Sequence, residues 1–208
     1  MMSAREVMMV SKIIPVISVK DADEMLRLAE ALMKGGVNIF EITLRTPKAL
    51  EAIEAVAKAF PDAITGAGTV INAETFKAVE DAGAKFAISP GLTRSLAASM
   101  KERNIPLLPG VATASEIMSG LEYGLDAFKL FPATIVGGVE ALKAFGGPFK
   151  DALFCPTGGI NASNAKSFLA LPNVACVGGS WIVPANLIQE KRFDEITRLT
   201  KEAVELLD

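Results

Sequence analysis

A-F-K-L-F-P-A, residues 127–133, is one of the short apolar segments that decide the fold of this chain. Such segments are typical of strands in a parallel sheet that is covered on both faces. Similar segments recur along the whole chain, and a helix-like stretch follows each of them. The predicted strands are residues 13–19, 39–45, 63–69, 86–90, 106–109, 127–131, 153–157 and 174–178.

The stretches between these strands carry helix start and stop signals. Asp21 and Glu24 have the spacing of a capping box, and Gly35 and Gly36 end the helix that follows. The other predicted helices are residues 49–60, 73–82, 93–103, 113–124, 139–145, 162–171 and 193–207.

Strands that alternate with helices predict an α/β fold with a parallel sheet. Eight units in sequence favour a closed (β/α)8 TIM barrel over an open doubly wound sheet. The chain has 208 residues, short for a barrel that typically takes about 250, so compact loops are expected. Residues 1–12 are expected to form an additional N-terminal helix, and residues 1–208 a single domain.

Composition narrows the class of protein. Half of the residues are apolar, 22% are charged and the net charge is −3 without a basic block, which gives no indication of a nucleic-acid partner. The longest apolar run near the N-terminus, residues 13–19, is too short for a membrane helix, and no signal-peptide cleavage site follows it. A cytoplasmic protein without a membrane partner is expected.

The chain contains no histidine. Ser-His-Asp and Cys-His catalysis are therefore excluded, and the commonest metal ligand is missing. Proton transfer must rest on Glu, Asp, Lys, Tyr, Cys or on phosphate groups of a substrate, and no metal or other cofactor is expected. Cys155 and Cys176 lie in apolar segments and are interpreted as small buried hydrophobes.

Lys129 is the only one of the lysines that falls inside an apolar strand. A buried ammonium costs several kcal/mol unless it is paired or loses its proton. One interpretation is that Lys129 forms an ion pair with Glu41, or that its aliphatic side chain is buried while its ammonium group reaches water. The other is a neutral amine that attacks a carbonyl, because burial disfavours the ammonium form.

Glu41, Thr43 and Arg45 share one face of their predicted strand, since strand side chains alternate. In (β/α)8 barrels the carboxyl ends of the strands carry the chemistry. Glu41 is a candidate for proton transfer, or compensates the charge of Lys129 or Arg45. Arg45 is a candidate for gripping a carboxylate, or pairs with Glu41.

Glycine pairs follow the last two predicted strands. Gly158 and Gly159 follow one strand, and Gly178 and Gly179 precede Ser180 at the end of the other. Backbone N–H groups in such loops bind anions, and the loops after strands seven and eight of these barrels often bind phosphate. The sequence therefore predicts a phosphate site there.

Together and in chain order, six motifs resemble the family of 2-keto-3-deoxy-6-phosphogluconate (KDPG) aldolase and 4-hydroxy-2-oxoglutarate aldolase. The resemblance runs from about residue 13 to the C-terminus. The motifs are E-I-T-L-R-T (41–46), G-A-G-T-V (66–70), F-A-I-S-P-G (86–91), F-K-L-F-P-A (128–133), P-T-G-G-I (156–160) and V-G-G-S-W (177–181).

The resemblance implies a homotrimeric (β/α)8 lyase that works without a metal. It implies cleavage of KDPG to pyruvate and D-glyceraldehyde 3-phosphate in the Entner–Doudoroff pathway, so that its partners are a phosphorylated 2-keto acid and pyruvate. Lys129 is implied as the Schiff-base lysine and Glu41 as the acid–base residue. The implied substrate-binding residues are Arg45, Thr69, Pro90, Phe131, Thr157, Gly158, Gly159, Gly178, Gly179 and Ser180.

Some alternatives stay open. Thr157 is the position that the family associates with the choice between gluconate and galactonate substrates, and threonine indicates the gluconate. The loop 134–136 is more apolar than expected of the family. Other hypotheses are a phosphosugar isomerase or synthase barrel, a metal-dependent pyruvate aldolase and a non-catalytic phosphosugar-binding protein.

Overall fold

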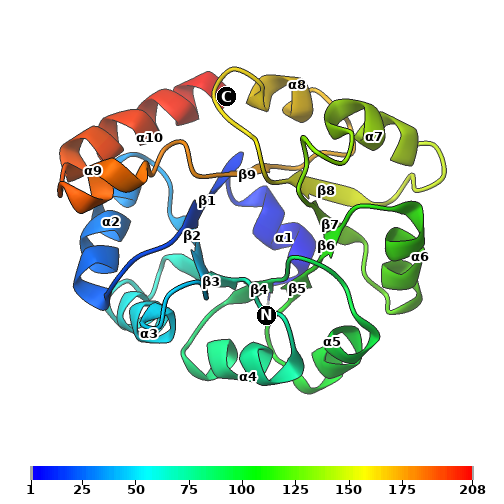
Figure 1. The fold of residues 1–208 in the computed structure, drawn as a ribbon, viewed down its shortest axis with the longest axis horizontal. Coiled ribbons are helices and arrows are strands. Elements are labelled where there is room, and N and C mark those ends of the chain that lie inside the picture. Colours follow the sequence, from blue (N-terminus) through cyan, green and yellow to red (C-terminus); the bar gives the residue numbers. More distant parts are fainter. Residues whose placement is uncertain (1, 208) are drawn as a thin grey trace.

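The computed structural model describes residues 2–207. It is an α/β fold in which helices form an outer ring around parallel strands (Figure 1). One sheet has the order β5-β4-β3-β2-β1-β9 and the other the order β6-β7-β8. The strands are β1 (Ile13–Ile17), β2 (Ile39–Thr43), β3 (Ile64–Gly68), β4 (Phe86–Ile88), β5 (Leu107–Leu108), β6 (Gly110–Val111), β7 (Ala127–Leu130), β8 (Leu153–Pro156) and β9 (Val177–Gly179).

The predicted strand 106–109 is wrong in one respect, because the structure has two short strands there. β5 pairs with β4, β6 pairs with β7, and only Pro109 separates the two. Pro109 has no N–H to donate to a ladder, although its carbonyl accepts a hydrogen bond from Lys129 N at 2.8 Å. Along β8 and β9 and the segments that adjoin them, isolated bridges join Phe154 to Val174 and Thr157 to Gly178.

Most helices lie where the sequence predicts them. The Asp21 side chain accepts a hydrogen bond from Glu24 N at 2.8 Å and caps α2. Residues 93–103 form α5 and a short 3₁₀ helix rather than one helix, and α9 was not predicted. The helices are α1 (Ala4–Met9), α2 (Ala22–Lys34), α3 (Ala49–Ala59), α4 (Ala73–Asp81), α5 (Arg94–Ser99), η1 (Met100–Glu102), α6 (Ala114–Glu122), α7 (Gly138–Phe145), α8 (Ala165–Leu169), α9 (Ala185–Gln189) and α10 (Phe193–Leu207).

Helix α1 precedes β1 and crosses the middle of the view in Figure 1. Arg5 joins it to the segments just before β7 and β8, through an ion pair with Asp126 at 2.6 Å and a hydrogen bond to the Asp151 carbonyl. Val7 and Met8 are buried. The helix therefore covers the amino ends of the strands and leaves the carboxyl ends free for a site.

The core continues from the strands to the surrounding helices. Five phenylalanines are among the largest fully buried side chains, and the rings of Phe128 and Phe154 lie 6.0 Å apart across β7 and β8. Among residues 2–207, no helix is both long enough and apolar enough to cross a membrane.

Candidate active site

Lys129 and Glu41 meet in the interior at 3.1 Å between Nζ and Oε1. Lys129 lies on β7 and Glu41 on β2, in different sheets, so both side chains point into the space between the strands. Their side chains are only 5% and 2% exposed. The ion pair, one of the interpretations open from the sequence, is therefore present, and it puts an amine and a carboxylate within proton-transfer distance.

The neighbouring strand β3 makes room for the Glu41 carboxylate. Gly68 lies against it, and a Cβ at Gly68 would overlap Glu41 Oε1. A Cβ at Gly66 would overlap the ring of Phe86 in the same way. Close packing thus requires glycine at both ends of the G-A-G segment (66–68). The missing side chain at Gly68 leaves the space that the Glu41 carboxylate occupies.

An aromatic ring forms one wall of the lysine site. Lys129 Nζ lies 5.1 Å from the centroid of the Phe131 ring, which is within the range of a cation–π contact. On the neighbouring strand β8, Cys155 is in register with Lys129. The amine is therefore held between Glu41, an aromatic face and an apolar strand.

A hollow of about 130 Å³ is lined in part by Phe131, whose ring contacts Lys129, whereas Lys129 and Glu41 themselves are not in its lining. It collects eight of the predicted site residues, from the ends of β2, β7, β8 and β9. The lining also includes Val16 and Ile160, which the sequence did not single out and which are ordinary apolar residues without a chemical signal. The predicted residues in the lining are Arg45, Phe131, Thr157, Gly158, Gly159, Gly178, Gly179 and Ser180.

The four glycines that line the hollow occupy positions where a side chain would be strained or would overlap a neighbour. Gly158 and Gly159 have φ of 99° and 78°, a conformation that side chains disfavour. A Cβ at Gly178 would overlap Thr157 Oγ1, and one at Gly179 would overlap the ring of Trp181. Each of these four positions therefore calls for glycine, and glycine loops of this kind can offer backbone N–H groups to an anion.

Arg45 brings positive charge to the same hollow. It is exposed and makes no ion pair within the described residues 2–207. The pairing of Arg45 with Glu41, one of the two alternatives open from the sequence, is absent there, and Glu41 pairs with Lys129 instead. Its guanidinium is thus available to an anionic ligand.

Thr69 and Pro90 lie outside the lining of this hollow. Thr69 directly follows Gly68 on β3, is half-buried and has a φ of 63°. Pro90 is exposed after β4, and its carbonyl lies against Gly110. Both follow the carboxyl ends of their strands, and their roles stay predictions.

The apolar loop 134–136 borders the hollow. Thr134 N donates a hydrogen bond to the Gly158 carbonyl at 3.2 Å, and the Thr134 side chain lies against Gly159. Ile135 is 81% exposed. The loop therefore supports the first glycine pair from outside and presents an apolar side chain at the rim.

Cys155 and Cys176 are free and buried. A hydrogen bond to Cys155 and burial together raise the pKa of Cys176 well above its ordinary value. The Cys176 thiol is therefore held in the protonated form, which is consistent with a structural role.

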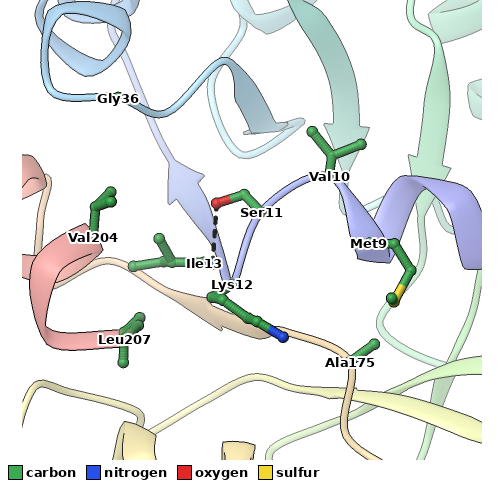
Figure 2. Close-up of a pocket in the computed structure, with 9 residues that line it drawn as sticks. All are labelled: Met9, Val10, Ser11, Lys12, Ile13, Gly36, Ala175, Val204 and Leu207. Carbon is green, nitrogen blue, oxygen red and sulfur yellow. Dashed lines mark hydrogen bonds between the residues drawn. The ribbon is translucent and has the colours of Figure 1, made fainter.

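Two further observations delimit the site. Within residues 2–207 no group of three His, Cys, Asp or Glu side chains is placed to hold a metal ion. Figure 2 shows another hollow, of about 300 Å³, between α1, β1 and α10. It contains Lys12 and Ser11 but none of the predicted site residues, so it is separate from the candidate site.

Comparison with known proteins agrees with this geometry. Residues 4–199 match the family model of KDPG and KHG aldolase. The KHG/KDPG aldolase of Escherichia coli (strain K12) is 50% identical over 203 residues, which are 98% of this chain and 95% of the relative.

Solved structures give the same result. The KDPG aldolase from Legionella pneumophila, with pyruvate captured at low pH as a covalent carbinolamine intermediate, is 49% identical with a TM-score of 0.96 and covers 98% of each chain. The 2-keto-3-deoxy-6-phosphogluconate aldolase of Zymomonas mobilis ZM4 with 3-phosphoglycerate is 45% identical, with a TM-score of 0.90 and coverage of 97% of this chain and 94% of that one.

Proposed function

Because this chain belongs to the KDPG and KHG aldolase family, we propose that it is a Schiff-base (class I) aldolase. It cleaves KDPG to pyruvate and D-glyceraldehyde 3-phosphate. The observation that carries the proposal is the buried Lys129 amine, 3.1 Å from the Glu41 carboxylate beside a hollow lined by glycine loops. The covalent carbinolamine in the Legionella pneumophila relative supports the same chemistry.

The reaction begins when Lys129 gives a proton to Glu41 and attacks the C2 carbonyl of the substrate. Glu41 returns this proton to the carbinolamine hydroxyl, which leaves as water, and the resulting iminium draws electrons from the C3–C4 bond. Glu41 as carboxylate takes the proton of the C4 hydroxyl, the C3–C4 bond breaks and the aldehyde leaves. The resulting enamine takes a proton at C3, and water releases pyruvate from Lys129.

The substrate has an anionic group at each end, and we assign each one a partner. Arg45 and Thr69 hold the carboxylate, since a guanidinium binds a carboxylate through two hydrogen bonds. The phosphate lies against Gly158, Gly159, Gly178, Gly179 and Ser180. Anchoring both ends fixes the C3–C4 bond beside Glu41, which is a positioning effect.

Phe131 and Pro90 are proposed to flank the carbon chain, and Thr157 to select the configuration at C4. Thr157 is buried at the end of β8, in the lining of the hollow. Comparing kcat/KM for KDPG and for its galactonate epimer tests this assignment, and we expect the gluconate to be preferred.

4-Hydroxy-2-oxoglutarate is a second substrate within the proposal. The Escherichia coli relative carries KHG in its name, and it is 50% identical to this chain. The smaller acid has the same 2-keto-4-hydroxy segment, so Lys129 and Glu41 can act on it unchanged. It lacks a phosphate, and a higher KM is expected.

A complete (β/α)8 barrel is the finer fold within the proposal, with α1 as the additional helix and the chain as one domain. Two observations support it. Strands β5 and β6 are separated by Pro109 alone, and the bridge between Thr157 and Gly178 joins β8 to β9. In this proposal β5 and β6 count as one strand, and the eight strands close into a ring.

A cytoplasmic homotrimer that needs no metal completes the proposal. Exposed apolar side chains at Ile71, Met118 and Leu121 offer surface for contact between copies. Light scattering after size exclusion tests the trimer, fractionation of cells tests the location, and assay with and without a chelator tests the independence from metal. Full activity after chelation is expected, and it would set aside a metal-dependent pyruvate aldolase.

Trapping with borohydride is the decisive experiment for the mechanism. Pyruvate and borohydride are expected to add a stable adduct that peptide mapping locates on Lys129. An isomerase, a synthase barrel or a non-catalytic phosphosugar-binding protein would form no such adduct. Its absence in the folded protein would overturn the Schiff-base mechanism.

A further inference from the structure

A second hollow, of about 280 Å³, adjoins the glycine-lined one. The two have Val16, Arg45 and Ser180 in common, so they form neighbouring parts of one opening at the carboxyl ends of the strands. The second hollow adds one hydroxyl that the reaction described above does not use, that of Ser18. Its remaining lining is Val183, Pro184, Ala185 and Ile188.

Ser18 stands directly after β1 and faces the site. Val16 is in register with Glu41 on the parallel strand β2, which puts Ser18 level with Thr43. Val16 and Ser18 share one face of the chain, because side chains alternate along a strand. Ser18 is therefore above Glu41, toward the mouth of the site.

The hydrogen bonds of Thr43 fix the direction of the Ser18 hydroxyl. Thr43 is buried, and its Oγ1 donates to the Ile17 carbonyl at 2.8 Å. A hydroxyl has only one proton to donate. In the 2.7 Å contact between Ser18 Oγ and Thr43 Oγ1, Ser18 is therefore the donor. This leaves the lone pairs of Ser18 Oγ facing the hollow as acceptors.

We infer that Ser18 is a specificity-determining residue that accepts a hydrogen bond from the C5 hydroxyl of KDPG. The inference rests on the proposed function, in which Lys129 attacks C2, Glu41 accepts the proton of the C4 hydroxyl and the glycine loops bind the phosphate. The C5 hydroxyl is the remaining donor of the carbon chain. 4-Hydroxy-2-oxoglutarate has a carboxylate at C5, which offers only acceptors to Ser18, so this contact favours the phosphorylated six-carbon acid.

The test uses the condensation direction, in which the aldehyde supplies C5. D-Glyceraldehyde 3-phosphate carries the hydroxyl in question at its C2, and 3-phosphooxypropanal lacks it. Ser18→Ala is expected to lower kcat/KM for D-glyceraldehyde 3-phosphate by about 3- to 10-fold, the effect of one hydrogen bond. The kcat/KM for 3-phosphooxypropanal should change less than about 2-fold, because there is no hydroxyl to lose. Ser18→Thr keeps the hydroxyl and should restore the discrimination.

Ser11→Ala is the matched control, since Ser11 lies before β1 in the separate hollow of Figure 2. It should leave both aldehydes unaffected. An equal loss on both aldehydes with Ser18→Ala, or no loss on either, would overturn the inference while pyruvate trapping at Lys129 stays normal. Failure of the parent enzyme to trap pyruvate would instead overturn the proposed function, and the assignment of Ser18 with it.

Discussion

Lys129 Nζ and Glu41 Oε1 lie 3.1 Å apart although 88 residues separate them in the chain. Both side chains are almost fully buried, so each is the main compensation for the other's charge. The same contact that stabilises the pair also gives the amine a base for its proton. Stability and chemistry are therefore coupled at this pair.

Replacement of Lys129 should separate the two roles. Lys129→Met is expected to abolish cleavage of KDPG and to lower the free energy of unfolding by about 3 kcal/mol, because Glu41 is left buried without a partner. The double variant Lys129→Met/Glu41→Gln should be inactive yet recover most of this loss. Denaturant unfolding and a coupled pyruvate assay measure both. Equal stability of the single and the double variant would contradict the coupling.

The first glycine loop should be sensitive to a single methyl group. Gly159→Ala is expected to raise KM for KDPG by about 10-fold or more, since the loss of one charge-assisted contact has this size. The added methyl overlaps the Thr134 side chain, so the loop must shift and the backbone groups assigned to the phosphate move with it.

Gly124→Ala is the control for this loop, because Gly124 and Gly159 both have a φ of 78°. A Cβ at Gly124 meets nothing within 4 Å. Both variants should be destabilised by about 1 kcal/mol through backbone strain, and Gly159→Ala by more, because its Cβ also overlaps the Thr134 side chain. Only Gly159→Ala should change KM, and an unchanged KM there would remove the phosphate from this loop.

Arg45→Gln should affect binding rather than folding. Arg45 is exposed and makes no ion pair within residues 2–207, so the free energy of unfolding should change by less than about 0.5 kcal/mol. Loss of a hydrogen-bonded charge should raise KM for KDPG by about 10- to 100-fold. Arg198→Gln on α10, where Arg198 pairs with Glu202, serves as the control. A normal KM in Arg45→Gln would show that Arg45 does not hold the substrate.

The two thiols should be unreactive in the native protein. The raised pKa of Cys176 means that its thiol stays protonated at pH 8, and only the thiolate attacks a disulfide reagent. Burial of Cys155 and Cys176 also excludes the reagent. A disulfide reagent such as 5,5′-dithiobis(2-nitrobenzoate) should therefore release little thiolate from the native protein and about two equivalents after denaturation. Rapid native labelling at full activity would contradict this packing.

The local structure could be predicted from sequence because its signals are local. The apolar run that contains Lys129 forms β7, and the capping spacing of Asp21 and Glu24 begins α2. The sequence could not predict that the strand divides at Pro109, with β5 paired to β4 and β6 paired to β7. A short apolar run does not indicate which strands will lie beside it. Helix α9 was missed because it has only five residues, too few to show a helical period.

The sequence by itself determined the alternation of strands and helices, the lack of histidine chemistry and the presence of one lysine in an apolar strand. Only the tertiary structure decided that this lysine pairs with Glu41, that Arg45 lines the same hollow as the two glycine pairs, and that Ser18 lies against Thr43. The physical reason is distance along the chain. Propensity and alternation act between near neighbours, whereas these contacts join separate strands and exist only when packing brings them together.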